Sequence, residues 1–141
     1  MFAQDIGPLP TPLCSGAFGL GDPVNISGTL IAATPSSQYY YLTNCSGSGG
    51  SITSNPANDV WYKFTATGHQ VIISITSTFT NPNLALFYGD CTSLYASVGA
   101  CAVGVGGSAS LTVEQLTVGE EYYLLISGNG TQTGTFNFDI K

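Results

Sequence analysis

The fold is decided by residues 60–76, which read VWYKFTATGHQVIISIT. Residues 60–64 and 71–75 both carry apolar side chains at every second position, with a more polar set between them. Such alternation is typical of a β-strand, because successive side chains of a strand point to opposite faces. Thr67, Gly68 and His69 separate the two runs. The stretch therefore predicts two strands joined by a short turn.

The rest of the chain repeats this pattern. Helix signals are nearly missing, since Gly or Pro interrupts most windows of ten residues. We predict strands at 24–32, 38–43, 60–65, 71–76, 84–88, 94–99, 111–113, 122–127 and 136–140. Many short strands between turn formers are typical of an antiparallel two-sheet β-sandwich. The fold class is therefore all-β, with about eight to nine strands in a jelly-roll-like or an immunoglobulin-like arrangement.

The domain organisation follows from the 141-residue length and from the prolines near the N-terminus. We predict a single β-sandwich domain at 14–141, preceded by an extended Pro-rich segment at 1–13. Prolines at 8, 10 and 12 would remove N–H donors from one edge of an extended strand. Leu9 and Leu13 then lie in a segment that can pair along one edge, as an edge or donor strand. A polyproline-like leader is the alternative, and Phe2-Ala3-Gln4 also resembles the end of a secretory signal.

Charge is scarce in this sequence. Lys and Arg together number 2 against 8 Asp and Glu, which gives a formal net charge of −6, and only 7% of residues are charged. Nucleic acid is excluded as a partner, because neutralising phosphates requires clustered basic side chains. No apolar run approaches the ~18 residues that a membrane-spanning helix needs. Residues 45–58, rich in Gly, Ser, Thr and Asn, predict a long surface loop.

Four cysteines indicate the compartment: Cys14, Cys45, Cys91 and Cys101. No CxxC pair is present to form a zinc ribbon or a thioredoxin-like site. An even number of cysteines in turn-rich stretches favours disulfides and an extracytoplasmic location over buried free thiols in the cytosol. Of the three pairings, the ten-residue spacing of Cys91 and Cys101 suits a bridge between adjacent strands. That pairing would leave Cys14 with Cys45.

Catalytic and metal-binding residues are few. His69 is the only histidine, and no G-x-S-x-G motif accompanies it, so we expect an exposed turn residue. Distant carboxylates could still converge as in a glycoside hydrolase; the acids considered are Asp59, Asp90, Glu114, Glu120 and Glu121. For a structural calcium ion, the available ligands are Asp22, Asn58, Asp59 and Asp90, without any Asp-Asp or Asp-x-Asp pair to concentrate charge.

Aromatic residues supply the remaining candidates for a binding surface. Tyr39, Tyr40 and Tyr41 are consecutive, so at least one of them leaves the core face. Trp61 alternates with Val60 and Tyr62, which places it on the other face of its strand. Outward aromatics can stack on sugar rings or pack against another subunit. The alternative is that all of these rings are buried in the sandwich.

Three stretches carry a family resemblance. They read NDVWYKFTA at 58–66, LALFYGDC at 84–91 with Leu94 and Cys101 beyond it, and LTVGEEYYL at 116–124 with GTF at 134–136. In order and spacing they resemble the bacterial pre-peptidase C-terminal domain family, in the form frequent in secreted Bacteroidetes proteins, over about residues 24–140. The resemblance implies a jelly-roll-like, non-catalytic β-sandwich that helps larger secreted proteins in attachment, secretion or assembly.

The resemblance also bears on two details. It supports pairing Cys91 with Cys101. Relatives often carry Asn-Asp-Asp after the second cysteine, in a stretch linked to calcium, whereas residues 102–107 here read AVGVGG. The sequence therefore lacks that family-type metal stretch.

We expect a secreted or cell-surface module that binds extracellular polysaccharide or protein, without catalysis and without a cofactor. The first alternative is a self-assembling subunit of an extracellular fibre or sheet, in which the N-terminal strand of one copy completes a sheet of the next. The second alternative is the glycoside hydrolase with converging carboxylates.

Overall fold

A computed structural model of the chain describes residues 18–19, 26–30, 41–42, 45–47, 52–53, 59–90, 93–129 and 132–141. At 18–19, 41–42, 53, 89–90 and 93–99 it describes the backbone alone. The predicted segment at 1–13, with Leu9 and Leu13, lies outside the described residues.

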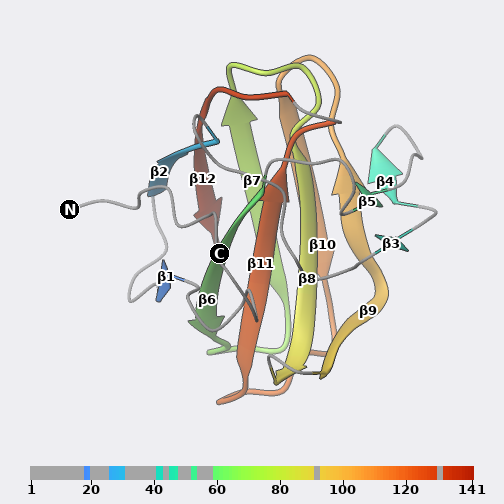
Figure 1. Cartoon of the computed structure of the whole chain (residues 1–141). Coiled ribbons are helices and arrows are strands. Elements are labelled where there is room, and N and C mark those ends of the chain that lie inside the picture. The colour runs from blue at the N-terminus through green and yellow to red at the C-terminus, as the bar shows by residue number, and fades with distance from the viewer. Residues whose placement is uncertain are drawn as a thin grey trace.

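The described elements are all strands, and they form two packed sheets (Figure 1). The larger sheet contains, in spatial order, β1 (Phe18–Gly19), β6 (Asp59–Thr65), β11 (Glu121–Ser127), β8 (Asn83–Asp90), β9 (Ser93–Val103) and β4 (Ser46–Gly47). The smaller sheet contains β10 (Ser108–Val113), β7 (Val71–Ser77), β12 (Thr135–Ile140) and β2 (Ile26–Thr29). A separate pair joins β3 (Tyr41–Leu42) and β5 (Ile52–Thr53).

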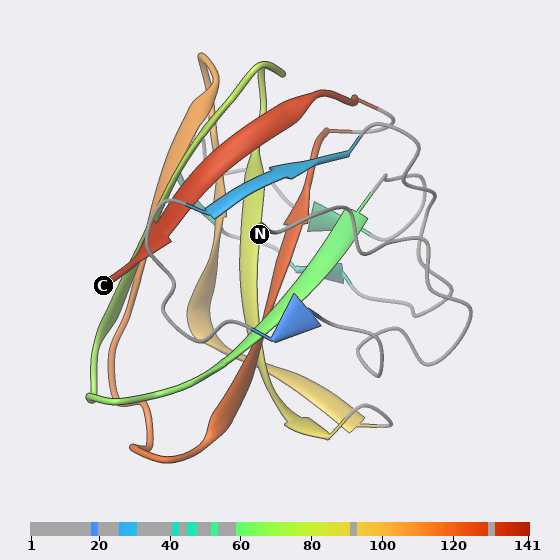
Figure 2. The same ribbon diagram turned by 90° about the vertical axis from the view of Figure 1, so that its left-hand side faces the viewer.

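Most neighbouring strands run antiparallel; the exceptions are β1 beside β6 and β4 beside β9. Figure 2, turned by 90°, shows the two sheets as separate layers, with β12 and β2 in one layer and β6 and β11 in the other. The predicted β-sandwich is therefore confirmed. Among the described residues, no helix has the length and hydropathy needed to cross a membrane.

The main core lies between the sheets and follows the sequence alternation. Val60 and Tyr62 of β6 are 0% exposed and face Ile73 and Phe138 of the smaller sheet in one apolar cluster. The rings of Tyr62 and Phe138 meet edge to face, with centroids 4.9 Å apart. The longer strands β6, β7, β8, β10, β11 and β12 bury their inward residues here, which is why alternation located them.

A second apolar cluster lies on the opposite face of the larger sheet. Its members are Cys45, Ile52, Trp61, Ala85, Phe87, Cys101, Val103, Tyr123 and Leu125. Cys45 and Ile52 are 3% and 1% exposed. The prediction of a surface loop over 45–58 is therefore wrong for its described residues, which form β4 and β5 and bury two side chains on this face.

Two strands are longer than the sequence pattern predicts. β9 continues from the predicted 94–99 through Val103, and β10 begins at Ser108 instead of Leu111. Opposite β9, the register moves from Ala85↔Cys101 to Phe87↔Ala96, so two residues of β8 span five of β9. Gly104–Gly107 make the turn to β10, with φ of 66° at Gly106 and 85° at Gly107. Gly106 and Gly107 are turn residues in the left-handed conformation that glycine adopts freely.

Candidate functional site

Trp61 does not lie on an exposed aromatic surface. Trp61 is 1% exposed and packs its ring against Phe87, with centroids 5.5 Å apart. The prediction of an exposed Trp61 is wrong, because the outer face of the larger sheet is itself buried. Tyr39 and Tyr40 lie outside the described residues, and Tyr41 is described only as backbone of β3.

The described disulfide joins Cys45 and Cys101, whose Cα atoms are 4.9 Å apart and whose sequence separation is 56. This corrects the expected pairing of Cys91 with Cys101 and of Cys14 with Cys45. β8 and β9 reverse direction between Asp90 and Ser93, whereas Cys101 is paired with Ala85 much further along β9. Cys14 and Cys91 lie outside the described residues. A disulfide is present, but it closes a long loop.

The candidate catalytic and metal-binding residues are dispersed. His69 is exposed in its turn, as predicted, and its Nδ1 lies 2.9 Å from the Leu116 carbonyl oxygen. Glu114, Glu120 and Glu121 are exposed. Within the described ranges, no three His, Cys, Asp or Glu side chains group as metal ligands. Asp22, Asn58 and the side chain of Asp90 lie outside what the structure describes.

Asp59 is buried instead in a polar row. Asp59, Ser127 and Asn83 are the buried polar residues of the described chain, at 2%, 0% and 4% exposed. The strand register pairs Ser127 with Asp59 on one side and with Asn83 on the other. The row therefore crosses β6, β11 and β8 on the same face as Trp61. Sequence reasoning placed Asp59 at a strand start but did not bring these three together.

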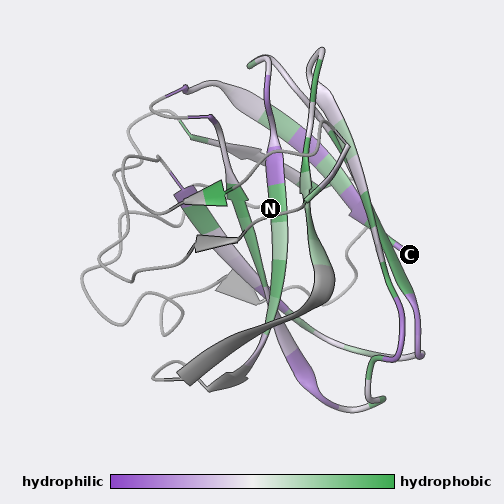
Figure 3. Cartoon of the chain, turned by 90° about the vertical axis from the view of Figure 1, so that its right-hand side faces the viewer, coloured by the Kyte–Doolittle hydropathy of each residue, from purple (hydrophilic) through white to green (hydrophobic). Residues whose placement is uncertain are grey.

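The outer face of the smaller sheet differs because it is open to solvent. Its outward side chains alternate with core residues, as in β7, where Ile73 and Ile75 are buried and Ile72, Ser74 and Thr76 are exposed. We call this surface the hydroxyl face; its members are Ser27, Ile72, Ser74, Thr76, Ser108, Ser110, Thr112, Asn137 and Asp139. Figure 3 shows hydrophilic and hydrophobic residues interleaved along these strands.

The hydroxyl face is ordered in rows by the strand register. Ser108 of β10 lies opposite Thr76 of β7, which lies opposite Asn137 of β12, which lies opposite Ser27 of β2. The Ser27 hydroxyl donates to Asn137 Oδ1 at 2.7 Å. The next row joins Ser110, Ser74 and Asp139 in the same manner. Polar groups thus repeat at the ~4.8 Å spacing between neighbouring strands.

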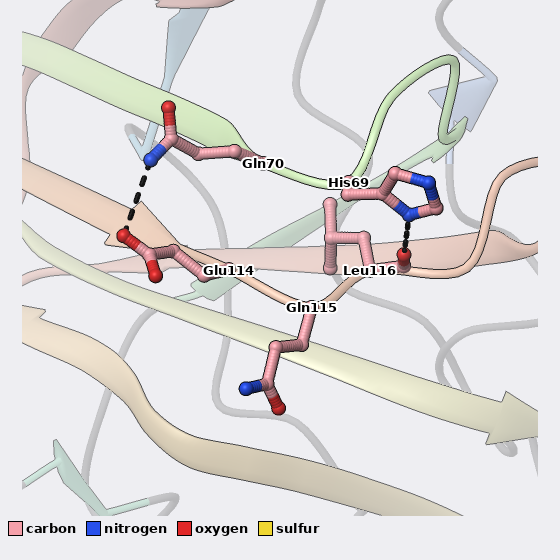
Figure 4. Close-up of a pocket in the computed structure, with 5 residues that line it drawn as sticks. All are labelled: His69, Gln70, Glu114, Gln115 and Leu116. Atoms are coloured by element: carbon pink, nitrogen blue, oxygen red, sulfur yellow. Dashed lines mark hydrogen bonds between the residues drawn. The ribbon is translucent and has the colours of Figure 1, made fainter.

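A hollow lies at each end of this face. One, of about 530 Å³, is lined by His69, Gln70, Glu114, Gln115 and Leu116, where β7 begins and β10 ends (Figure 4). The other, of about 210 Å³, is lined by Thr76, Ser77, Thr78, Thr135, Phe136 and Asn137. Along β7 the distance from Gln70 to Thr78 is ~26 Å at the usual strand rise of about 3.3 Å per residue. Both hollows adjoin the hydroxyl face, and the exposed lining of the larger one is more apolar than polar.

The chemistry of this surface is hydrogen bonding with little charge. Hydroxyl and amide side chains both donate and accept hydrogen bonds, so they match a ligand that does the same. Asp139, half-buried in β12, is the charged residue among these members. The exposed Lys141 pairs with Ile72 at the end of the same sheet, and Glu114 lines the larger hollow. The sequence alternation shows the polar half of each strand, but it does not say which strands lie side by side.

The comparisons with known proteins establish the fold. No protein-family model and no curated protein matches the chain. The crystal structure of the pre-peptidase C-terminal domain of a collagenase from Bacillus anthracis is similar, with a TM-score of 0.55 and 16% identity, over 89% of this chain and 94% of that one. At that identity the similarity shows a shared β-sandwich fold, as the sequence resemblance implied.

Two further solved structures are more distant. CorA, a surface-associated copper-binding protein of Methylomicrobium album BG8, gives a TM-score of 0.49 at 10% identity over 99% of both chains. PirA gives a TM-score of 0.43 at 8% identity, over 74% of this chain and 92% of that one.

Proposed function

We propose that this chain is a non-catalytic extracellular module that binds neutral polysaccharide along its hydroxyl face. The observation that carries the proposal is the register-aligned array of exposed Ser, Thr and Asn side chains between two hollows. A polysaccharide is an extended, uncharged chain whose hydroxyls both donate and accept, so it can meet successive rows of this face.

The energetics favour a polymer over a small ligand. A single hydrogen bond exchanged with water contributes only about 1 kcal/mol. The hydroxyl face has no deep apolar cavity and exposes one large apolar side chain, Ile72, which is 39% exposed. Useful affinity therefore requires several contacts to be made at once, which a chain spanning the ~26 Å from Gln70 to Thr78 provides.

The location outside the cytosol is supported by the disulfide. Cys45 and Cys101 form a bridge between buried residues, and such bridges persist mainly in oxidising compartments.

A net charge of −6 with two basic residues gives no electrostatic attraction to anionic partners. Binding to a neutral polymer should therefore depend little on salt.

A matched pair of variants tests the proposal. Ser74 is exposed at the centre of the hydroxyl face, and its register partner on β12 is Asp139. Thr65 is exposed on β6 of the other sheet, and its register partner on β11 is Glu121. Ser74→Lys and Thr65→Lys thus each place a long cation beside a carboxylate on a strand. Only the first covers the proposed surface.

Depletion assays with cellulose and chitin powders give the readout. We expect the unmodified chain to bind at least one powder at both low and high salt. Ser74→Lys should weaken binding by about tenfold, equivalent to about 1.4 kcal/mol, and Thr65→Lys should leave it unchanged. The proposal is wrong if the unmodified chain binds neither powder, or if the two variants lose binding equally while both remain folded.

A further inference from the structure

The larger hollow contains a residue in an unusual backbone conformation. Gln115 has φ of 67°, and it is the non-glycine residue with positive φ in the described chain. Glycine adopts this left-handed region freely, whereas a residue with a side chain is sterically disfavoured there.

The conformation arises from a bulge. Val113 is paired with Val71, and the next backbone contact on this side is Leu116 N–H to the His69 carbonyl, at 2.9 Å. Glu114 and Gln115 therefore lie opposite the single residue Gln70, and two residues against one is the definition of a β-bulge. Bulges with a left-handed residue usually carry glycine there, and they redirect side chains near functional sites.

The groups around Gln115 are already held in place. Gln70 Nε2 donates to Glu114 Oε2 at 3.2 Å, and His69 Nδ1 donates to the Leu116 carbonyl at 2.9 Å. Figure 4 shows the Leu116 side chain between these two pairs, while the Gln115 side chain extends away from them. Among the described residues, none hydrogen-bonds the exposed Gln115 amide. The fold therefore keeps the free Gln115 amide at the hollow, although the left-handed backbone conformation of this residue disfavours any side chain.

We propose that this hollow recognises the acetamido group of an N-acetylated hexosamine unit, with Gln115 as the specificity-determining residue. This rests on the proposed polysaccharide binding and names its ligand class. An acetamido group offers one N–H donor, one carbonyl acceptor and a methyl group. The Gln115 amide supplies an acceptor and a donor for the first two, and the hollow, whose exposed lining is more apolar than polar, accommodates the methyl group.

The neighbouring carboxylate adds to this match. Glu114 uses Oε2 for Gln70, which leaves Oε1 available to accept from a sugar hydroxyl or N–H. A plain glucose unit carries a hydroxyl in place of the acetamido group, so it cannot form the paired donor and acceptor contacts with the Gln115 amide. Sites built to hydrogen-bond a group discriminate strongly against ligands that lack it.

Isothermal titration calorimetry with two soluble probes tests the assignment: the hexamer of N-acetylglucosamine and the hexamer of glucose. We expect the unmodified chain to bind the N-acetylated hexamer about tenfold more tightly. Gln115→Gly should abolish that preference by weakening binding of the N-acetylated hexamer about tenfold, with a smaller change for the glucose hexamer. Its Tm should be unchanged or raised, because glycine accepts the left-handed conformation. Gln115→Asn, which keeps an amide and tolerates this conformation, should retain part of the preference.

Each outcome separates the two proposals. Equal binding of both hexamers by the unmodified chain would overturn the acetamido assignment and leave polysaccharide binding standing. Binding of neither hexamer, together with neither powder, would overturn both. A Gln115→Gly variant with a lowered Tm and a uniform loss of affinity for both hexamers would show that Gln115 acts only structurally, which also overturns the assignment.

Discussion

The outer faces of the two sheets contrast in almost every property. On the larger sheet, Trp61, Phe87 and Leu125 are at most 5% exposed and form an apolar cluster. On the smaller sheet, the corresponding positions are exposed hydroxyls such as Ser74 and Thr76. Both sheets meet at the same core, so the contrast concerns only what each sheet turns outward.

This difference shows how a solvent-exposed sheet face can be recognised from the burial pattern along its strands. β6 and β11 are buried at nearly every position, which is typical of a sheet covered on both faces. β7, β10 and β12 alternate between buried and exposed residues, which is typical of a sheet with one solvated face. The described aromatic side chains apart from Tyr88, which is 41% exposed, therefore serve packing, and the proposed contact surface consists of hydroxyl groups.

The largest expected effect is the loss of stability when a buried residue of the covered face is truncated. Trp61→Ala should lower the free energy of unfolding by about 4 kcal/mol, because it empties a buried indole site. Ile72→Ala on the hydroxyl face should lower it by less than about 1 kcal/mol, since Ile72 is 39% exposed. Urea denaturation of the two variants measures both values. Similar losses at the two positions would show that both faces are covered.

The second effect concerns the bridge that lies on the covered face. Replacing both Cys45 and Cys101 by Ala should lower the free energy of unfolding by about 3 kcal/mol, because the unfolded chain regains the freedom of a long loop. Thermal melts, with peptide mapping of the unreduced protein, provide the measurement. A peptide that links Cys91 to Cys101 would contradict the described pairing.

The smallest expected effect concerns the buried hydroxyl group of Ser127 on the covered face. Ser127 is 0% exposed, and its Oγ has no hydrogen-bond partner among the described residues. Ser127→Ala removes that unsatisfied hydroxyl, so it should leave stability unchanged or raise it by up to about 1 kcal/mol. Urea denaturation checks this. A loss above about 1 kcal/mol would mean that the hydroxyl makes a contact in solution, for instance through water.

Much of the fold could be predicted from the sequence, because burial on one side of a strand leaves a period-two pattern. The patterns at 60–65, 71–76 and 136–140 correspond to β6, β7 and β12. The extension of β9 to Val103 could not be predicted, since its residues lack such alternation and its register shifts opposite Ala85. Cys101 consequently lies within a strand and bonds Cys45.

The candidate site was less predictable than the fold. The hydroxyl face depends on lateral pairing, such as Thr76 between Ser108 and Asn137, and these residues are distant in sequence. Trp61 was misassigned because alternation identifies the other face of a strand but does not reveal whether that face is covered. The signal for Gln115 is also structural, since only the bulge after Val113 exposes its conformation.

Nuclear magnetic resonance titration of the isotopically labelled chain with the N-acetylglucosamine and glucose hexamers tests the central claim most directly. We predict that backbone amides of β7, β10 and β12, including those of Ser74, Ser110 and Asn137, change chemical shift with at least one hexamer. Those of Thr65 and Glu121 on the larger sheet should stay constant. Shifts confined to the larger sheet would contradict the account, as would a spectrum that neither hexamer perturbs.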